Sequence, residues 1–255
     1  MKFADKLNEV FFPSGIKCLI CGDDIPEGSR FPVCENCAPK RNLTFCLTCG
    51  RNMSVGSQYC TNCKSKEWSF RKARAPFVYD GEIRHLIHRL KYGGHKYLAQ
   101  EIAVYLADAY FEYGLMSDII TFVPMFHKKM KRRGYNQAEE LAVALGEKTN
   151  TEVRTLLIKT IQTKSNARLN AAERSKSIKD TIDIVRDEKG HSVDLKDKRI
   201  LLIDDVFTTG ATAQECAKAL MKAHAAEVNV LTLATAKHSD NPVSKRKTSL
   251  KDINP

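Results

Sequence analysis

Short apolar runs and helical apolar stripes take turns along most of the chain after residue 80. Short runs rich in apolar residues predict strands at 118–124, 153–158, 182–185, 200–203 and 228–234, and the run 200–203, which has no polar residue, suits a strand buried on both faces. Apolar residues spaced three and four positions apart predict helices over 83–90, 98–111, 138–145 and 213–221. Because strands alternate with helices, we expect an α/β fold with a doubly wound parallel sheet flanked by helices.

One junction between a strand and a helix carries the most distinctive chemistry. Asp204 and Asp205 follow the run 200–203, and a loop rich in threonine then opens the next helix. Backbone N–H groups of this loop and the positive end of the helix dipole point at one spot, and Gly210 allows a close approach. We predict that the loop binds a phosphate group. Its residues are Val206, Phe207, Thr208, Thr209, Gly210, Ala211 and Thr212.

The acidic pair lies where both carboxylates could accept hydrogen bonds from the vicinal hydroxyls of a ribose. The pair and the loop together resemble the signature of type I phosphoribosyltransferases. The resemblance implies that Asp204 and Asp205 hold the ribose of phosphoribosyl pyrophosphate during catalysis, with Mg2+ bound to the ligand. A Walker A loop is excluded because no glycine precedes the Lys-Ser/Thr pair that it needs. The simpler interpretation is a buried strand that ends in a solvated acidic turn.

Eight of the nine cysteines form four Cys-x-x-Cys pairs in the first 63 residues. Four thiolates are the usual ligands of structural zinc, so the pairs predict two closed zinc sites and folding that depends on zinc. Gly22 and Gly50 follow the first and third pairs, which favours sequential sites, although an interleaved pairing is also possible. A ribbon that binds nucleic acid or a partner and a structural cap are both compatible with this pattern. The ligands are Cys18, Cys21, Cys34, Cys37, Cys46, Cys49, Cys60 and Cys63.

The net charge of +11 indicates polyanionic partners, either nucleic acid or phosphorylated small molecules. The densest group of cations lies in a predicted loop after the first strand, at the sheet edge where α/β folds bind ligands. A long polar segment, 159–177, is predicted to be a lid. We expect pyrophosphate or DNA to contact Lys128, Lys129, Lys131, Arg132, Arg133 and the lid residue Arg174. The simpler interpretation is a solvated loop.

Tyrosines interleave with cations between residues 71 and 97, as in a stacking surface for single-stranded nucleic acid. No apolar run approaches the about 20 residues of a membrane span, and the first residues lack the apolar core of a secretory signal. We therefore expect a cytoplasmic protein without membrane insertion. Three parts are predicted: a lead-in with a double zinc ribbon at 1–66, a phosphoribosyltransferase-like domain at 67–236 and a basic, disordered tail at 237–255.

Four features, in this order, resemble the ComF family of bacterial competence proteins. They are the cysteine module, Lys91-Tyr92-Gly93-Gly94 at a helix end, Arg133-Gly134-Tyr135-Asn136-Gln137, and the Asp-Asp/Thr-Thr-Gly-Ala-Thr signature. The resemblance covers residues 16–236 and implies a small zinc-ribbon module followed by a type I phosphoribosyltransferase domain, with a role in DNA uptake or natural transformation. The chain departs from the family in the lid, near Asn166 and Ser177, where Gln and Asn are expected.

Three functions are compatible with these observations. The first is a competence factor that binds phosphoribosyl pyrophosphate in a pocket, single-stranded DNA on its basic face and other competence proteins such as a DNA-translocating helicase. The second is a phosphoribosyltransferase of nucleotide metabolism, of the purine, pyrimidine or amido type. The third is a zinc-ribbon adaptor with a vestigial pocket. The sequence identifies no acceptor substrate.

Overall fold

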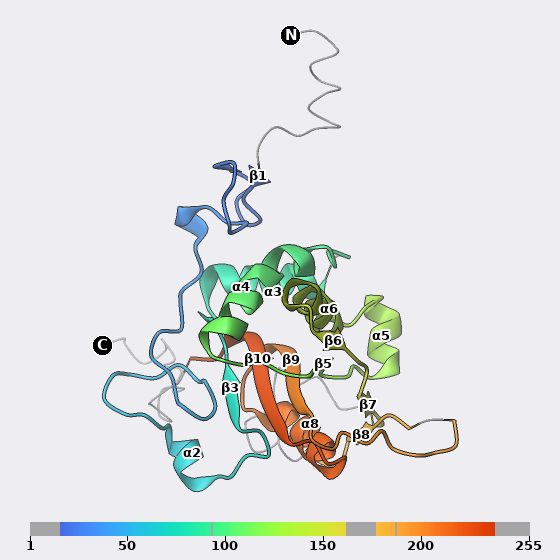
Figure 1. The fold of residues 1–255 in the computed structure, drawn as a ribbon. Coiled ribbons are helices and arrows are strands. Elements are labelled where there is room, and N and C mark those ends of the chain that lie inside the picture. Colours follow the sequence, from blue (N-terminus) through green and yellow to red (C-terminus); the bar gives the residue numbers. More distant parts are fainter. Residues whose placement is uncertain (1–15, 93, 162–176, 187, 238–255) are drawn as a thin grey trace, which may run out of the picture.

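A computed structural model of the chain describes residues 16–92, 94–161, 177–186 and 188–237 (Figure 1). The predicted N-terminal lead-in, most of the lid with Asn166 and Arg174, and nearly all of the tail lie outside the described residues. The elements are β1 (Ile16–Lys17), β2 (Asp24–Ile25), η1 (Glu35–Cys37), α2 (Thr61–Ser65), β3 (Lys72–Arg74), β4 (Phe77–Val78), α3 (Gly81–Lys91), α4 (Leu98–Glu112), β5 (Ile119–Phe122), α5 (His127–Arg133), α6 (Gln137–Thr149), β6 (Glu152–Val153), β7 (Leu157–Lys159), β8 (Ile182–Ile184), β9 (Arg199–Phe207), α8 (Ala211–Lys222) and β10 (Glu227–Thr235).

A parallel sheet with strand order β3-β10-β9-β5-β6 forms the centre of the molecule, and β4 also pairs with β10. Strands β9 and β10 are nine residues each and lie side by side. Leu202 of β9 is opposite Val230 of β10 on one side and Thr121 of β5 on the other. The middle of β9 therefore has a strand on both sides and no exposed edge.

Both faces of the sheet are covered by helices (Figure 1). Helices α3, α4 and α6 pack on one face, with Leu201 and Ile203 of β9 in that core. Helix α8 packs on the other face, with Ile200 and Leu202 of β9 in that core. Because successive strand residues point to opposite faces, burial of both faces requires an unbroken apolar run. The α/β prediction is confirmed: this is a parallel sheet flanked by helices.

Strand β9 is longer than the sequence predicts. The apolar run ends at Ile203, but backbone pairing with β10 continues to Phe207 and Thr235. Asp204 and Asp205 are therefore residues of the strand and do not follow it. The prediction was wrong about the end of the strand because strand pairing, and not side-chain polarity, sets that end.

Two of the runs predicted to be strands of the main sheet are arranged differently in the structure. The run 153–158 is divided between β6 in the main sheet and β7, and β7 pairs with β8 in a separate antiparallel pair. The run 182–185 therefore contributes no strand to the main sheet. Ile158 is half exposed, since this pair is covered on one face only, by α8. Short apolar runs do not distinguish such a pair from a buried parallel strand.

Strands β3 and β4 were not predicted. Lys72 and Arg74 flank the buried Ala73, so β3 has only one fully buried residue and reads as a polar segment. It lies at the sheet edge, beside β10. An edge strand needs little apolar surface, which explains why the hydrophobic pattern does not indicate it.

The cationic run after β5 is the helix α5 and not a loop. It has no apolar stripe, so periodicity gave no signal. Gly134 ends the helix with a φ of 88°. The next two residues then fix the chain: Tyr135 donates its hydroxyl to the Leu90 carbonyl at 2.6 Å, and Asn136 caps α6 by accepting from the Ala138 N–H. The Arg-Gly-Tyr-Asn-Gln motif therefore joins α5, α6 and the end of α3.

The two cysteine-rich segments dock on different parts of the fold. In the first, Phe31 stacks on Tyr105 of α4 with ring centroids 4.8 Å apart, and Arg89 of α3 donates to the Leu19 carbonyl. In the second, the Thr48 carbonyl accepts from the Ala73 N–H of β3 at 2.7 Å. Packing thus crosses the predicted boundary between residues 66 and 67, and the three-part division remains a prediction. No helix in the described ranges is long and apolar enough to cross a membrane.

The knuckle glycines of the two segments provide a matched test of this docking. Both have positive φ, 82° at Gly22 and 65° at Gly50. A Cβ at Gly50 would lie 2.4 Å from the Ala73 carbonyl oxygen, whereas at Gly22 it would meet no described atom within 4 Å. We expect Gly22→Ala to cost about 1 kcal/mol through backbone strain and Gly50→Ala roughly 2 kcal/mol more through overpacking. Urea denaturation at a fixed zinc concentration measures both. Equal losses would contradict the contact with β3.

Candidate functional site

The predicted phosphate loop lies between β9 and α8. Gly210 is the N-terminal cap of α8, with a φ of 76°, and its carbonyl accepts from the Gln214 N–H at 2.8 Å. A Cβ at Gly210 would lie 2.6 Å from Phe207 and 2.8 Å from the Trp68 ring. Glycine is therefore required both by the backbone conformation and by the space available. The N-terminus of α8, together with the backbone N–H groups of the preceding loop, suits an anion.

Asp205 is buried and forms an ion pair with Lys91, the last residue of α3. Burial lowers the pKa of Lys91, but the charges of Asp205 and Asp204 more than offset it, and the net shift is upward. The lysine is therefore fully charged at neutral pH. Lys91 was noted in the Lys-Tyr-Gly-Gly motif but was not predicted to belong to the site. That motif, at a helix end, was the available signal.

Asp204 is the next residue along β9, and its Oδ1 accepts from the Asp205 N–H at 2.8 Å. Burial and the neighbouring charge of Asp205 raise the pKa of Asp204 well above its usual value, while Lys91 opposes the shift. Lys91 therefore does not offset the effect of burial and of the second carboxyl on Asp204. Two carboxyls in this state are typical of a place where a further cation binds.

A cationic cavity adjoins the acidic pair. Its volume is about 190 Å³, and it is lined by Lys91, Tyr92, Lys129, Arg132 and Arg133. Desolvation and the charges of Arg133 and Lys91 lower the pKa of Lys129. Because Lys91 lines the cavity and also pairs with Asp205, the cavity and the acidic pair are adjacent. Cations held this close together favour a multiply charged anion.

The predicted cationic residues divide into two groups. Lys129, Arg132 and Arg133 line the cavity, whereas Lys128 and Lys131 are exposed on α5 and do not. Arg133 also lies over the Tyr92 ring, 5.0 Å from its centroid. The sequence could not separate these groups because the run was expected to be a loop, whereas a helix brings residues three and four positions apart, such as 129, 132 and 133, to one side.

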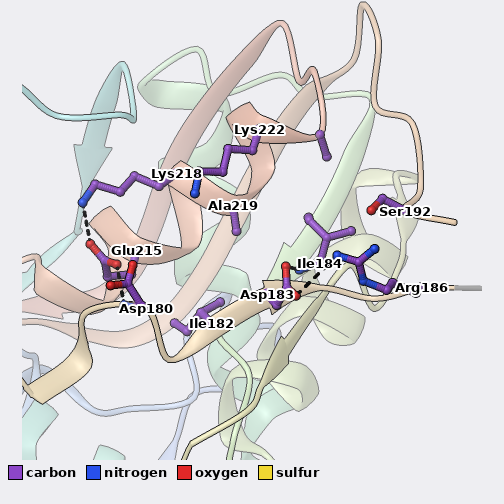
Figure 2. Close-up of a pocket in the computed structure, with 11 residues that line it drawn as sticks. Asp180, Ile182, Asp183, Ile184, Arg186, Ser192, Glu215, Lys218, Ala219 and Lys222 are labelled. Carbon is purple, nitrogen blue, oxygen red and sulfur yellow. Dashed lines mark hydrogen bonds and ion pairs between the residues drawn. The ribbon is translucent and has the colours of Figure 1, made fainter. Parts of the chain in front are cut away.

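A larger cavity of about 320 Å³ lies between β8 and α8 (Figure 2). Its charged side chains pair with one another: Lys218 with Glu215 at 2.7 Å, and Arg186 with Asp183 at 3.7 Å. Glu215 also accepts from the Asp180 N–H. None of the predicted site residues lines this cavity, so size alone does not identify the functional site.

The eight paired cysteines form two separate clusters. Within each cluster the four sulfur atoms lie within 4.8 Å of one another. The sets are sequential, which decides between the two pairings left open by the sequence. They are Cys18, Cys21, Cys34 and Cys37 in the first cluster and Cys46, Cys49, Cys60 and Cys63 in the second.

The geometry of both clusters fits zinc. The sulfurs of Cys21 and Cys34, and those of Cys49 and Cys60, are 3.7 Å apart. A tetrahedral ion with Zn–S bonds of about 2.3 Å separates its sulfurs by about 3.8 Å. Hydrogen bonds, first from the Cys49 thiol and then from backbone amides, lower the pKa of Cys46 to about 4, which favours the thiolate form that binds metal.

Comparison with known proteins agrees with this geometry. A family model described as phosphoribosyl transferase domain matches residues 130–254. Competence protein F of Haemophilus influenzae is 28% identical over 227 residues, covering 86% of this chain and 97% of that protein. Competence protein ComFC of Streptococcus pneumoniae is 28% identical over 240 residues, covering 86% and 99%. The chain is a homologue of the ComF-type competence proteins.

A further relative is the DNA utilization protein YhgH of Escherichia coli, 25% identical over 224 residues, with 85% of this chain and 95% of that protein covered. Solved structures with some likeness include the glutamine phosphoribosylpyrophosphate amidotransferase from B. subtilis, with 22% identity, a TM-score of 0.33 and coverage of 53% and 25%. The purine phosphoribosyltransferase from Pyrococcus horikoshii has 23% identity, a TM-score of 0.32 and coverage of 52% and 70%.

The raised pKa of Asp204 predicts a pH dependence of stability. Between the pKa of an unfolded aspartate, about 3.9, and the higher folded value, the folded protein holds a proton that the unfolded chain has released. Stability therefore falls as pH rises through this window. We expect Asp204→Asn to remove this slope and to raise the free energy of unfolding at neutral pH by about 1 kcal/mol or more. Urea denaturation from pH 4 to pH 8 measures the effect.

Asp118→Asn is the matched control with the opposite sign. Hydrogen bonds from Arg199 hold the pKa of Asp118 at about 2, so its contribution to stability is present above the unfolded pKa and is lost as pH falls toward 2. This variant should lose stability at neutral pH. A gain or no change in Asp118→Asn, or an unaltered slope in Asp204→Asn, would contradict the electrostatic account.

Proposed function

We propose that this ComF-type protein acts in DNA uptake, binding phosphoribosyl pyrophosphate with Mg2+ at the β9–α8 junction and single-stranded DNA on the adjacent basic surface. The observation that carries the proposal is the contact between Lys91 and Asp205, because it joins the acidic pair to the cationic cavity. The site then has three adjacent parts. They are a loop for one phosphate, a carboxyl pair for a ribose and a cationic cavity for a second charged group. Phosphoribosyl pyrophosphate carries these three groups in this order.

Each part of the ligand has a proposed place. The 5′-phosphate would bind to the loop 206–212 at the N-terminus of α8. The ribose hydroxyls would bind to Asp204 and Asp205, and the pyrophosphate to Lys129, Arg132 and Arg133, with Arg174 added from the predicted lid. Mg2+ prefers oxygen ligands and neutralises pyrophosphate, and its charge would oppose the burial and the repulsion from Asp205 that raise the pKa of Asp204.

The same residues would support phosphoribosyl transfer. Substitution at the anomeric carbon passes through a cationic sugar, which carboxylates beside the ribose stabilise electrostatically. The charges of the cavity would stabilise the departing pyrophosphate. This is the basis for the alternative function, a phosphoribosyltransferase of nucleotide metabolism, which differs from the first in releasing pyrophosphate with a base or amine as acceptor.

Zinc in both cysteine clusters is part of the proposal. Four sulfur ligands leave no open coordination position, so the role is structural and not catalytic. Reduced thiols that serve as metal ligands fit a reducing compartment, which supports the expected cytoplasmic location.

The DNA-binding proposal is supported by an exposed aromatic and cationic cluster next to the cavity. Tyr92 and Tyr97 are 52% and 55% exposed. The His88 ring lies 4.7 Å from the Tyr92 ring, and the Arg133 guanidinium lies 5.0 Å from the centroid of the same ring. Exposed rings among cations bind single strands by stacking and charge neutralisation. The names of the relatives, competence and DNA utilization proteins, agree with a DNA ligand. Other competence proteins, such as a helicase, are the proposed partners.

Calorimetric titration with phosphoribosyl pyrophosphate and Mg2+ tests the pocket. We expect the wild type to bind and Asp204→Asn/Asp205→Asn to lose at least tenfold in affinity, because the ribose and metal lose their carboxylates. Lys129→Gln/Arg133→Gln should also lose at least tenfold. Lys128→Gln/Lys131→Gln removes the same charge outside the cavity and should change affinity less than twofold. No binding by the wild type would favour an adaptor with a vestigial pocket, and equal losses in the two cation variants would reject the cavity.

Salt dependence of single-stranded DNA binding tests the basic surface. Lys128→Gln/Lys131→Gln removes two phosphate contacts, so the slope of log affinity against log salt should become less steep by about 1.4. Tyr92→Ala should weaken binding at every salt concentration through lost stacking, by roughly tenfold. Lys196→Gln/Lys222→Gln, which removes two exposed charges elsewhere, is the control. Equal effects of the two lysine pairs would show that only the net charge attracts DNA.

A further inference from the structure

The second cysteine cluster and the predicted phosphate loop contact each other through two side chains. Arg51 lies two residues after the ligand Cys49, and its Nη2 donates to the Thr208 carbonyl at 2.7 Å. Trp68 donates its indole N–H to the sulfur of Cys63 at 3.2 Å. The same indole ring approaches Gly210 so closely that no Cβ fits between them. The second cysteine segment therefore packs against the loop through Arg51 and Trp68.

The Trp68 ring is itself held in place. It packs against Phe70 at 4.9 Å and Phe207 at 6.4 Å between centroids, and the Lys66 ammonium lies 4.1 Å from the ring centroid. Its N–H···S bond fixes the edge of the ring to a metal ligand, an arrangement that orients both partners. A shift of Cys63 would consequently move the ring that bounds Gly210.

The first turn of α8 is tied to the same segment. Gln214 accepts from the Ser69 N–H at 2.8 Å and donates to the Ser69 hydroxyl at 3.0 Å. The second cysteine segment and the residues after it therefore contact the loop and the start of α8 at Thr208, Gly210 and Gln214. In the described residues the first cluster is held by other partners, through Phe31 on α4 and Arg89 of α3.

Arg51 also brings a charge to the loop. Its Nε is buried and has no hydrogen-bond partner among the described residues. The Arg51 guanidinium holds the Thr208 carbonyl by a hydrogen bond. It also places a positive charge and a further N–H donor beside a loop that suits an anion. The sequence gave no signal for this role, because Arg51 follows a cysteine knuckle and is remote from the loop in the chain.

We propose that Arg51 and Trp68 are positioning residues of the phosphate loop, and that the second cysteine cluster, with its metal bound, sets the conformation of the loop and its affinity for a phosphorylated sugar. The part of this inference that concerns affinity rests on the proposed function. The part that concerns the order of the loop does not. The second cluster is then a component of the binding site, and the first cluster is separate from it.

Arg51→Gln tests the proposal, with Arg30→Gln as the matched control, since Arg30 joins the first segment to Asp108 of α4. Hydrogen exchange of the amides of 206–212 and calorimetric affinity for phosphoribosyl pyrophosphate with Mg2+ are measured on the full zinc-loaded chain. In Arg51→Gln we expect at least fivefold faster exchange in the loop and about tenfold weaker binding, with unchanged zinc content. Arg30→Gln should change neither quantity.

Trp68→Phe provides a second variant that keeps most of the packing and removes only the indole N–H and the second ring. It should also accelerate exchange in 206–212. If the wild type does not bind the ligand, the proposed function fails, and the exchange rates still decide whether the cluster orders the loop. Unchanged exchange in both variants, at native zinc content, would overturn the inference, as would equal acceleration in Arg30→Gln.

Discussion

The ion pair between Lys91 and Asp205 is the interaction on which the candidate site depends. It fixes the end of α3 to the middle of the sheet and places the cationic cavity beside the acidic pair. Loss of either partner would leave a charge in a partly desolvated place without compensation, which is far more costly than loss of a surface ion pair. Burial and the charge of Asp205 keep the pKa of Asp204 raised in spite of Lys91, so a positively charged ligand component would be stabilised beside Asp204.

The cysteine clusters differ in what they contribute. The first segment packs Leu19, Ile20, Phe31 and Val33 against the core that contains α3, α4 and α6, and an ion pair and a bond to a backbone carbonyl also attach it there. In the second, Cys46, Cys49 and Cys60 are buried in the same core as α8 and the sheet. A metal there would stabilise the phosphate loop along with its own segment, since the two share one set of packed side chains.

Much of the fold could be predicted because burial leaves a direct record in the sequence. The unbroken run of β9 and the stripes of α3, α4, α6 and α8 follow from the faces that each element buries. Edge strand β3 and helix α5 could not be predicted, since one buries a single small residue and the other none. The antiparallel pair β7–β8 was mistaken for strands of the main sheet because short apolar runs do not show which strand they pair with.

The sequence by itself determined the chemistry that local spacing encodes: four-cysteine sets, a glycine at the start of α8 and two adjacent carboxyls. Tertiary structure alone decided which of these groups meet. Lys91 reaches Asp205 only when α3 packs on the sheet, and Arg51 reaches Thr208 only when the second cluster docks on β3. Spacing along the chain fixes geometry within a turn or a loop, whereas contacts between distant residues depend on how apolar faces pack against one another.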